Sequence, residues 1–90
     1  MNSAERRYLW RVKNLACVCC GAHGPCDAHH LREGQGLSQK ASHYLTIAVC
    51  KECHQGANGI HGDRSLMRLY KLSELELLAK TIEQLNEGNK

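Results

Sequence analysis

The sequence predicts a small α+β fold on three observations. Apolar residues recur at three- and four-residue steps near both ends of the 90-residue chain, which predicts helices there. Residues 44–49, YLTIAV, form a β-branched apolar run that predicts a strand in the middle. Two Cys-x-x-Cys pairs flank this middle part. We therefore expect one domain over residues 1–90, with a helix over 1–14, a core over 15–62 and further helices over 63–87.

The first 14 residues predict a basic helix. Ser3 can cap it, and its apolar face comes from Tyr8, Leu9, Val12 and Leu15. Four basic side chains stand against one acidic side chain in this segment, although the net charge of the whole chain is only +3. Such a basic face is a candidate contact for phosphate groups, and an ordinary solvated helix face is an equally good interpretation.

The middle of the chain predicts turns and two short strands. Residues 17–24, CVCCGAHG, are too rich in cysteine and glycine for regular structure and predict a metal-binding knuckle, with His23 on its surface. A strand over 27–31 follows, and a polar loop over 32–42 leads to the strand at 44–49. A short helix over 51–56 then ends at the GANG turn of residues 56–59.

Two helices are expected in the last third of the chain. Asp63 can cap the first, and Ser73 with Glu76 forms a capping box for the second. We expect the apolar side chains of these helices to face the core, and we assign them no chemistry. They are Leu66, Leu69 and Tyr70 in the first helix and Leu75, Leu78, Ile82 and Leu85 in the second.

The two Cys-x-x-Cys pairs predict a structural zinc site. Cys17 with Cys20, and Cys50 with Cys53, have the spacing that lets two thiolates from one turn bind the same ion. Four thiolates fill a tetrahedral coordination shell and leave no position open for chemistry. The basic N-terminus has no secretory signal, so we expect a cytoplasmic protein, in which such pairs bind metal in preference to forming disulfides. The zinc would also stabilise a chain too short for a large core.

Two further cysteines, Cys19 and Cys26, lie outside the pairs. We expect both to be free buried thiols, because a reduced cysteine packs like a small apolar side chain. The spacing also allows Cys26 to replace Cys20 or Cys17 as a zinc ligand.

The histidines predict a second metal site that is open to substrate. His29, His54 and His61 could supply three imidazole nitrogens and leave one position of the ion unoccupied by protein. His30 follows His29 directly, and neighbouring side chains of a strand point to opposite faces, so these two histidines need different roles. The ordinary pKa of histidine lies near neutrality, which suits His30 to act as a general base.

The order of cysteines and histidines in this chain resembles that of the HNH endonucleases, which have a ββα-metal core. The segments that carry the resemblance are CVCC, DAHHL, YLTIAVCKECH and a last His. The resemblance covers about residues 15–62 and is closest to small phage and prophage nucleases linked to recombination. It implies a DNA phosphodiester hydrolase in which His30 is the general base and His29, His54 and His61 hold one catalytic cation. That cation could be Mg²⁺, Mn²⁺, Ni²⁺ or Zn²⁺. The cut would leave a 3′ hydroxyl.

The chain departs from the HNH pattern in two places. His43 stands where the family has Asn, and it would orient the general base through a hydrogen bond or would contact DNA. The six-residue gap between His54 and His61 is wider than one helical turn, so the GANG turn must fold His61 back. If it does not, Asp63 or a water would complete the site.

We expect DNA as the partner, no membrane contact, and a role beside a phage or host recombination or packaging protein. Candidate phosphate contacts are basic side chains throughout the chain. They are Arg6, Arg7, Arg11, Arg32, Lys40, Lys51, Arg64 and Arg68.

Two other functions fit the same residues. One is a zinc module that binds nucleic acid without cutting it, in which the histidines serve packing or a second structural metal. The other is a zinc domain of the RING or LIM kind, which would bind a protein through the C-terminal helices.

Overall fold

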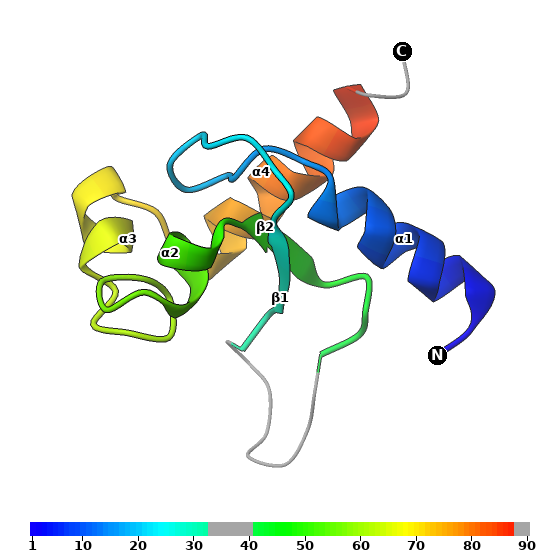
Figure 1. Ribbon diagram of the computed structural model, residues 1–90, viewed down its shortest axis with the longest axis horizontal. Coiled ribbons are helices and arrows are strands. Elements are labelled where there is room, and N and C mark those ends of the chain that lie inside the picture. The colour runs from blue at the N-terminus through cyan, green and yellow to red at the C-terminus, as the bar shows by residue number, and fades with distance from the viewer. Residues whose placement is uncertain (33–40, 88–90) are drawn as a thin grey trace.

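The computed structural model describes residues 1–32 and 41–87. Its element order is α1 (Ser3–Lys13), β1 (Asp27–His30), β2 (Thr46–Val49), α2 (Lys51–Gln55), α3 (Ser65–Tyr70) and α4 (Glu74–Glu87). The predicted α+β fold is therefore confirmed, with helices before and after a two-stranded sheet (Figure 1). Most of the predicted loop 32–42, with the candidate phosphate contact Lys40, falls on residues 33–40 and lies outside the described residues.

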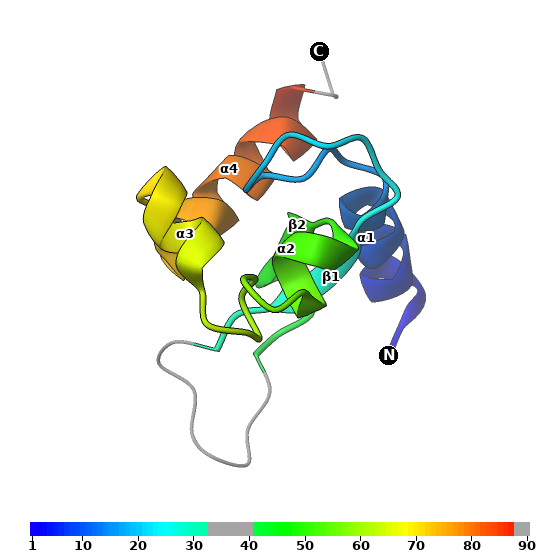
Figure 2. The ribbon, with the colours of Figure 1, turned by 60° about the vertical axis from the view of Figure 1, so that its left-hand side comes forward.

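The sheet pairs β1 and β2 antiparallel, with His29 opposite Ile47 and His30 opposite Thr46. All four residues of β2 are buried, because α1, α2 and α4 pack around this strand. Figures 1 and 2 show α1 and α3 on opposite sides of the sheet. The core is thus a thin layer of aliphatic side chains around β2, extended by the cysteines of the knuckle.

The capping residue of helix α1 lies one position before the predicted one. Asn2, and not Ser3, is the capping residue: its side chain accepts a hydrogen bond from the backbone N–H of Glu5 at 2.8 Å. The Glu5 carboxylate accepts the backbone N–H of Asn2 at the same distance, which completes a capping box. Val12 is fully buried, and the Arg11 guanidinium donates to the backbone oxygen of Leu85, which ties the end of α1 to the end of α4.

The predicted core stripes of the last two helices are only partly correct. In α3 the buried side chain is Met67, whereas Leu69 and Tyr70 are exposed. In α4 the predicted core residues Leu75 and Ile82 are 58% and 42% exposed. The buried face of α4 is Glu74, Leu77, Leu78, Thr81 and Leu85.

The shift of the buried face in α4 comes from two polar side chains, Glu74 and Thr81, that form hydrogen bonds in the interior. The Thr81 hydroxyl accepts the backbone N–H of Ala48 in β2 at 3.2 Å and donates to the backbone oxygen of Leu77. Burial of a polar group is tolerated when its hydrogen bonds are kept, so a search for apolar residues alone misplaces this face.

The predicted capping residue is found at the start of α4, whereas at the start of α3 a different residue precedes the helix. At the start of α4 the Ser73 hydroxyl accepts the backbone N–H of Glu76 at 3.1 Å, which is one of the two bonds of the predicted capping box. The Glu76 carboxylate accepts the Ser73 hydroxyl at 3.1 Å, whereas a capping box would have it accept the Ser73 backbone N–H. At the start of α3 the Asp63 carboxylate accepts the backbone N–H of Ser65 at 2.9 Å, but the residue that precedes the helix is Arg64. Arg64 has φ 61°, a left-handed conformation. None of the helices in the described part of the chain is long and apolar enough to cross a membrane.

Candidate metal centres

The four predicted zinc ligands come together. Cys17 and Cys20 lie in the turn between α1 and β1, Cys50 precedes α2, and Cys53 lies within α2. One Sγ atom from each lies within 4.8 Å of the others, and the Sγ atoms of Cys20 and Cys50 are 3.7 Å apart. The structure therefore contains a four-cysteine cluster that could hold a metal ion such as zinc.

The turn that carries Cys17 and Cys20 is held in place by backbone hydrogen bonds. The N–H of Cys17 donates to the backbone oxygen of Ala22, and the N–H of Val18 donates to Ala48 of β2 at 3.0 Å. Gly21 has φ 83°, which an L side chain rarely adopts, so the turn depends on glycine at this position. These contacts fix the first cysteine pair against the strand that leads to the second pair.

The surroundings shift the pKa values of the cluster cysteines in opposite directions. Burial alone would raise the pKa of Cys17, but backbone hydrogen bonds of Cys50, Cys20 and Cys19 lower it. Burial, followed by the neighbouring sulfurs of Cys17, Cys50 and Cys20, raises the pKa of Cys53. A cation bound among the four sulfurs would favour the deprotonated form of every ligand.

Cys19 and Cys26 are buried and free of disulfides, as predicted. Neither belongs to the four-cysteine cluster, so the alternative in which Cys26 replaces Cys20 or Cys17 is not what the structure contains. The Cys26 thiol donates to the backbone oxygen of Leu15 at 3.2 Å, and burial raises its pKa to about 11. It is therefore protonated at neutral pH.

His29, His54 and His61 form a second cluster. They come from β1, from α2 and from the turns after α2, and one ring nitrogen of each lies within 4.8 Å of the others. The ring centroids are 4.7 to 5.1 Å apart. Three imidazoles at this separation could bind one cation together.

The GANG turn brings His61 back to His54. The backbone N–H of His61 donates to the oxygen of His54 at 3.0 Å, and that of Ile60 donates to Cys53 at 2.7 Å. A Cβ atom at Gly59 would lie 2.4 Å from the oxygen of Cys53, so this close return requires glycine. Asp63, the substitute ligand that the sequence allows, is exposed and outside the cluster.

Each histidine of this three-histidine cluster has a polar partner on one ring nitrogen. His29 contacts the Glu74 carboxylate through Nε2 at 2.8 Å, and His54 contacts the Asp27 carboxylate through Nδ1 at 2.9 Å. The Arg32 guanidinium donates to Nδ1 of His61 at 3.1 Å. The sequence pattern predicts neither Glu74 nor Asp27 as a site residue.

The surroundings favour neutral imidazoles at two of the three positions. Burial lowers the pKa of His29, although the contact with Glu74 acts in the opposite direction. Burial, followed by electrostatic repulsion from the neighbouring His54, Arg32 and Arg64 side chains, lowers the pKa of His61. Neutral imidazole is the form that binds a metal ion, so these shifts suit the residues to that role.

His30 and His43 form a separate pair. Nε2 of His30 lies 3.0 Å from Nδ1 of His43, and the ring centroids are 5.1 Å apart. His30 is next to His29 in β1, and the alternation of side chains along a strand accounts for their different partners. The two histidines predicted to cooperate as base and orienting residue are therefore in contact.

The predicted phosphate contacts come from different elements of the fold. Arg6, Arg7 and Arg11 belong to α1, and the Arg11 side chain is engaged with α4. Lys51 is exposed at the start of α2, and Arg32 is exposed beside His61. His23, the predicted surface residue of the knuckle, is also exposed.

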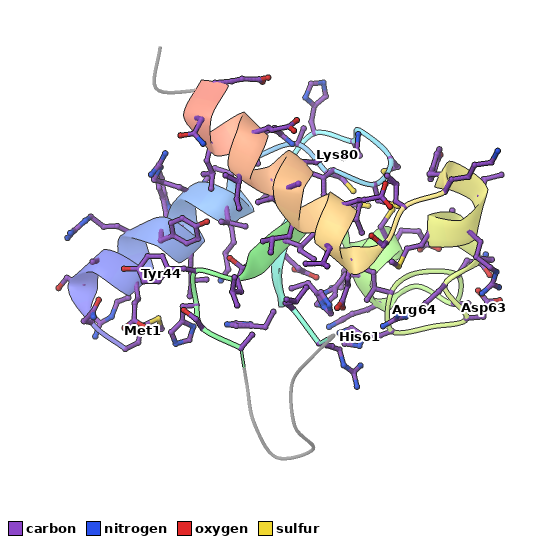
Figure 3. All side chains as sticks on the ribbon, turned by 180° about the vertical axis from the view of Figure 1, so that it is seen from behind. Met1, Tyr44, His61, Asp63, Arg64 and Lys80 are labelled. Carbon is purple, nitrogen blue, oxygen red and sulfur yellow. The ribbon has the colours of Figure 1, made fainter. Side chains whose placement is uncertain are left out.

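The remaining predicted contacts gather beside α3. Arg64 and Arg68 line a shallow hollow of about 390 Å³, together with Lys71, which the sequence pattern does not single out. Figure 3 shows Arg64 and His61 on the same side of the molecule. The hollow therefore brings together two of the predicted phosphate contacts and one further cation.

No protein-family model, curated protein or solved structure matches the chain. The resemblance to HNH endonucleases consequently depends on the cysteine and histidine pattern described above.

Proposed function

We propose that this protein is a metal-dependent endonuclease that hydrolyses DNA phosphodiester bonds with a ββα-metal core of the HNH type. One observation carries the proposal. Ring nitrogens from β1, from α2 and from the turns after α2 converge within 4.8 Å, and the residue next to the first of them contacts a further histidine at 3.0 Å. This arrangement combines a cation site with a candidate general base in adjacent residues of one strand.

The donor set fits a catalytic cation better than a structural one. His29, His54 and His61 offer three nitrogens, and a tetrahedral ion would keep one position for a phosphate oxygen or water. A bound divalent cation, Mg²⁺, Mn²⁺, Ni²⁺ or Zn²⁺, would stabilise the charge that develops on the scissile phosphate and on the leaving 3′ oxygen. The four-cysteine cluster has a full set of protein donors and would serve as the structural zinc site.

His30 is the proposed general base and His43 the residue that orients it. In a contact between two neutral imidazoles one nitrogen donates and the other accepts. A neutral imidazole at position 30 has one ring nitrogen with a lone pair, and this nitrogen would take a proton from the attacking water. His43 would then serve the role that Asn has in the nucleases that the pattern resembles.

The charge distribution supports a polyanionic substrate. Arg32 lies against His61, and Arg64, Arg68 and Lys71 surround the hollow beside α3. Guanidinium and ammonium groups there would hold phosphates of the DNA backbone without reading its sequence. We extend the proposal to a phage or prophage origin, a cytoplasmic location and a partner in recombination or packaging, as the resemblance implies.

A non-catalytic zinc module that binds nucleic acid is the second candidate. The observation in its favour is the His29–Glu74 contact, because both side chains are almost completely buried and the pair could serve packing alone. In that case the protein would bind DNA through its basic side chains and would not need an open cation site.

Cleavage of supercoiled plasmid DNA with added Mg²⁺, Mn²⁺ or Ni²⁺ tests the proposal. We expect nicked or linear product with the wild-type protein and a loss of about 10²- to 10⁴-fold in rate for His30→Ala. His23→Ala is the matched control, since it removes an exposed imidazole from the knuckle and should cut normally. DNA binding without cleavage in every metal would contradict the nuclease and favour the module.

A further inference from the structure

Glu74 is a carboxylate inside the protein. It lies in the first turn of α4 and is 0% exposed, whereas the other acidic residue in that turn, Glu76, is exposed. A buried carboxylate is costly unless its oxygens accept hydrogen bonds. The other buried residues of α4, which are Leu77, Leu78, Thr81 and Leu85, carry no charge, so a carboxylate on this face needs a specific explanation.

Both oxygens of Glu74 are engaged with β1 and the segment that follows its end. Oε2 lies 2.8 Å from Nε2 of His29, and Oε1 accepts the backbone N–H of Arg32 at 2.9 Å. The Arg64 guanidinium approaches Oε2 to 4.0 Å. Glu74 therefore holds both the ring of His29 and the backbone of Arg32. These two contacts fix the C-terminal end of β1 against α4.

The His29–Glu74 contact links the hydrogen position on the His29 ring to the charge of the carboxyl group. When Glu74 is ionised its oxygens can only accept, and Nε2 of His29 is then the nitrogen that carries hydrogen. In a neutral imidazole the lone pair is then on Nδ1, the atom left to bind a cation. Asp27 contacts the other ring nitrogen in His54: its carboxylate lies against Nδ1, so Nε2 is the atom left to bind a cation.

We propose that Glu74 is a positioning residue for the metal site: it holds the His29 ring and its Nε2 hydrogen so that Nδ1 is presented to the cation shared with His54 and His61. Carboxylates that hold the distal nitrogen of a metal-bound histidine commonly strengthen the site in this way. The inference depends on the cation site of the proposed function, but not on DNA cleavage. It assigns a role to α4, which lies outside the region that resembles the HNH nucleases.

Glutamine is the informative replacement at position 74. Its side chain has the same shape but only one accepting oxygen. If that oxygen accepts the Arg32 N–H, the amide NH₂ faces His29 and moves the ring hydrogen to Nδ1, which blocks the ligand atom. If the amide turns the other way, two donors face each other at Arg32. Either arrangement should weaken the cation site without removing much packing volume.

Cobalt titration measures the effect on the metal site alone. Protein that holds one equivalent of zinc per chain is titrated with Co²⁺, and the visible absorption of the cobalt complex gives its affinity. We expect Glu74→Gln to bind Co²⁺ roughly 10- to 100-fold more weakly than wild type. Glu83→Gln, which removes one charge from an exposed position of α4, should match wild type. A folded Glu74→Gln protein with wild-type cobalt affinity would overturn the proposal.

A measurement on the wild-type protein decides the matter if Glu74→Gln does not fold. Nitrogen-15 NMR of the imidazole side chains distinguishes the two neutral forms of a histidine ring. In the zinc-loaded protein without added cobalt we expect hydrogen on Nε2 of His29, and hydrogen on Nδ1 would overturn the proposal. If wild type binds no cobalt, this inference and the nuclease proposal both fail. If it binds cobalt but cuts no DNA, only the nuclease proposal fails.

Discussion

Nε2 of His30 lies 3.0 Å from Nδ1 of His43, although the two residues belong to different sides of the β1–β2 hairpin. His43 precedes β2, and its backbone oxygen accepts a hydrogen bond from the Thr46 hydroxyl. Thr46 is fully buried and pairs with His30 across the sheet. The position of the His43 ring is therefore linked to the same strand pairing that places His30. This link makes His43 a testable partner of the proposed base.

Replacement of His43 should reduce DNA cleavage less than replacement of His30. His43→Ala removes the orienting contact but leaves the base, so we expect a loss of roughly tenfold in the single-turnover rate, against about 10²- to 10⁴-fold for His30→Ala. His43→Asn should retain more activity than His43→Ala, because an amide can still hydrogen-bond to the His30 ring. Equal rates for wild type and His43→Ala would show that the contact has no catalytic role.

Loss of one thiolate from the four-cysteine cluster should unfold the protein. Binding of a structural zinc ion contributes about 10–16 kcal/mol in small zinc domains, which is as large as the whole stability of a typical domain, about 5–15 kcal/mol. We therefore expect Cys50→Ser to lose zinc and its circular dichroism signal of folded structure.

Cys26→Ser is the control for the zinc prediction. Cys26 is also a buried cysteine, but it lies outside the cluster and donates to the backbone oxygen of Leu15, a bond that a serine hydroxyl can replace. This variant should keep one equivalent of structural zinc and stay folded. A folded, soluble Cys50→Ser protein would refute the structural role of the cluster.

Removal of the Arg32 charge should strengthen the three-histidine site for cations. The Arg32 guanidinium donates to Nδ1 of His61 at 3.1 Å, so a cation bound by His61 has to compete with this positive charge. Two unit charges about 4 Å apart repel by about 1 kcal/mol in water, and the double charge of Co²⁺ raises this to about 2 kcal/mol, or roughly a 30-fold change in affinity. Arg32→Gln should therefore bind Co²⁺ up to about 30-fold more tightly, with the effect reduced at high salt. Weaker cobalt binding by Arg32→Gln would mean that Arg32 supports the site and does not compete with the cation.

The cations beside α3 should contribute to DNA affinity through phosphate contacts. Removal of one such contact lowers the slope of log affinity against log salt by about 0.9 for duplex DNA. We expect this change for Arg68→Ala, measured by fluorescence anisotropy with a labelled duplex at several salt concentrations. Lys80→Ala removes one exposed charge from α4 and should leave the slope unchanged (Figure 3). The same slope for wild type and Arg68→Ala would exclude the α3 hollow from the DNA contact.

The sequence predicts the positions of the helices and strands well and the buried face of α4 poorly. The β-branched run and the cysteine pairs locate β2 and the knuckle, because both signals are local. The face of α4 depends on long-range hydrogen bonds of Glu74 and Thr81 to β1 and β2, and spacing of apolar residues cannot reveal these. Leu75 and Ile82 fit the apolar spacing, but these two polar residues occupy the core instead.

Contacts between distant parts of the chain also limit how much of the candidate site the sequence predicts. His29, His54 and His61 can be grouped from their neighbours in the sequence, but their carboxylate and guanidinium partners cannot. The sequence does contain a signal for Glu74: it precedes Leu77, Leu78, Thr81 and Leu85 by three, four, seven and eleven residues, the spacing of a single helix face. An acidic residue in phase with a buried face is a reason to look for a buried partner.

The most direct test of the account is X-ray diffraction from crystals grown with zinc, measured at the zinc absorption edge. We predict two zinc peaks per chain, one among the four sulfurs and one about 2.0–2.1 Å from a ring nitrogen of each of His29, His54 and His61. The second ion should keep a coordination position that no protein atom fills. Absence of this second peak, or an ion there enclosed by four protein ligands, would contradict the proposed catalytic site.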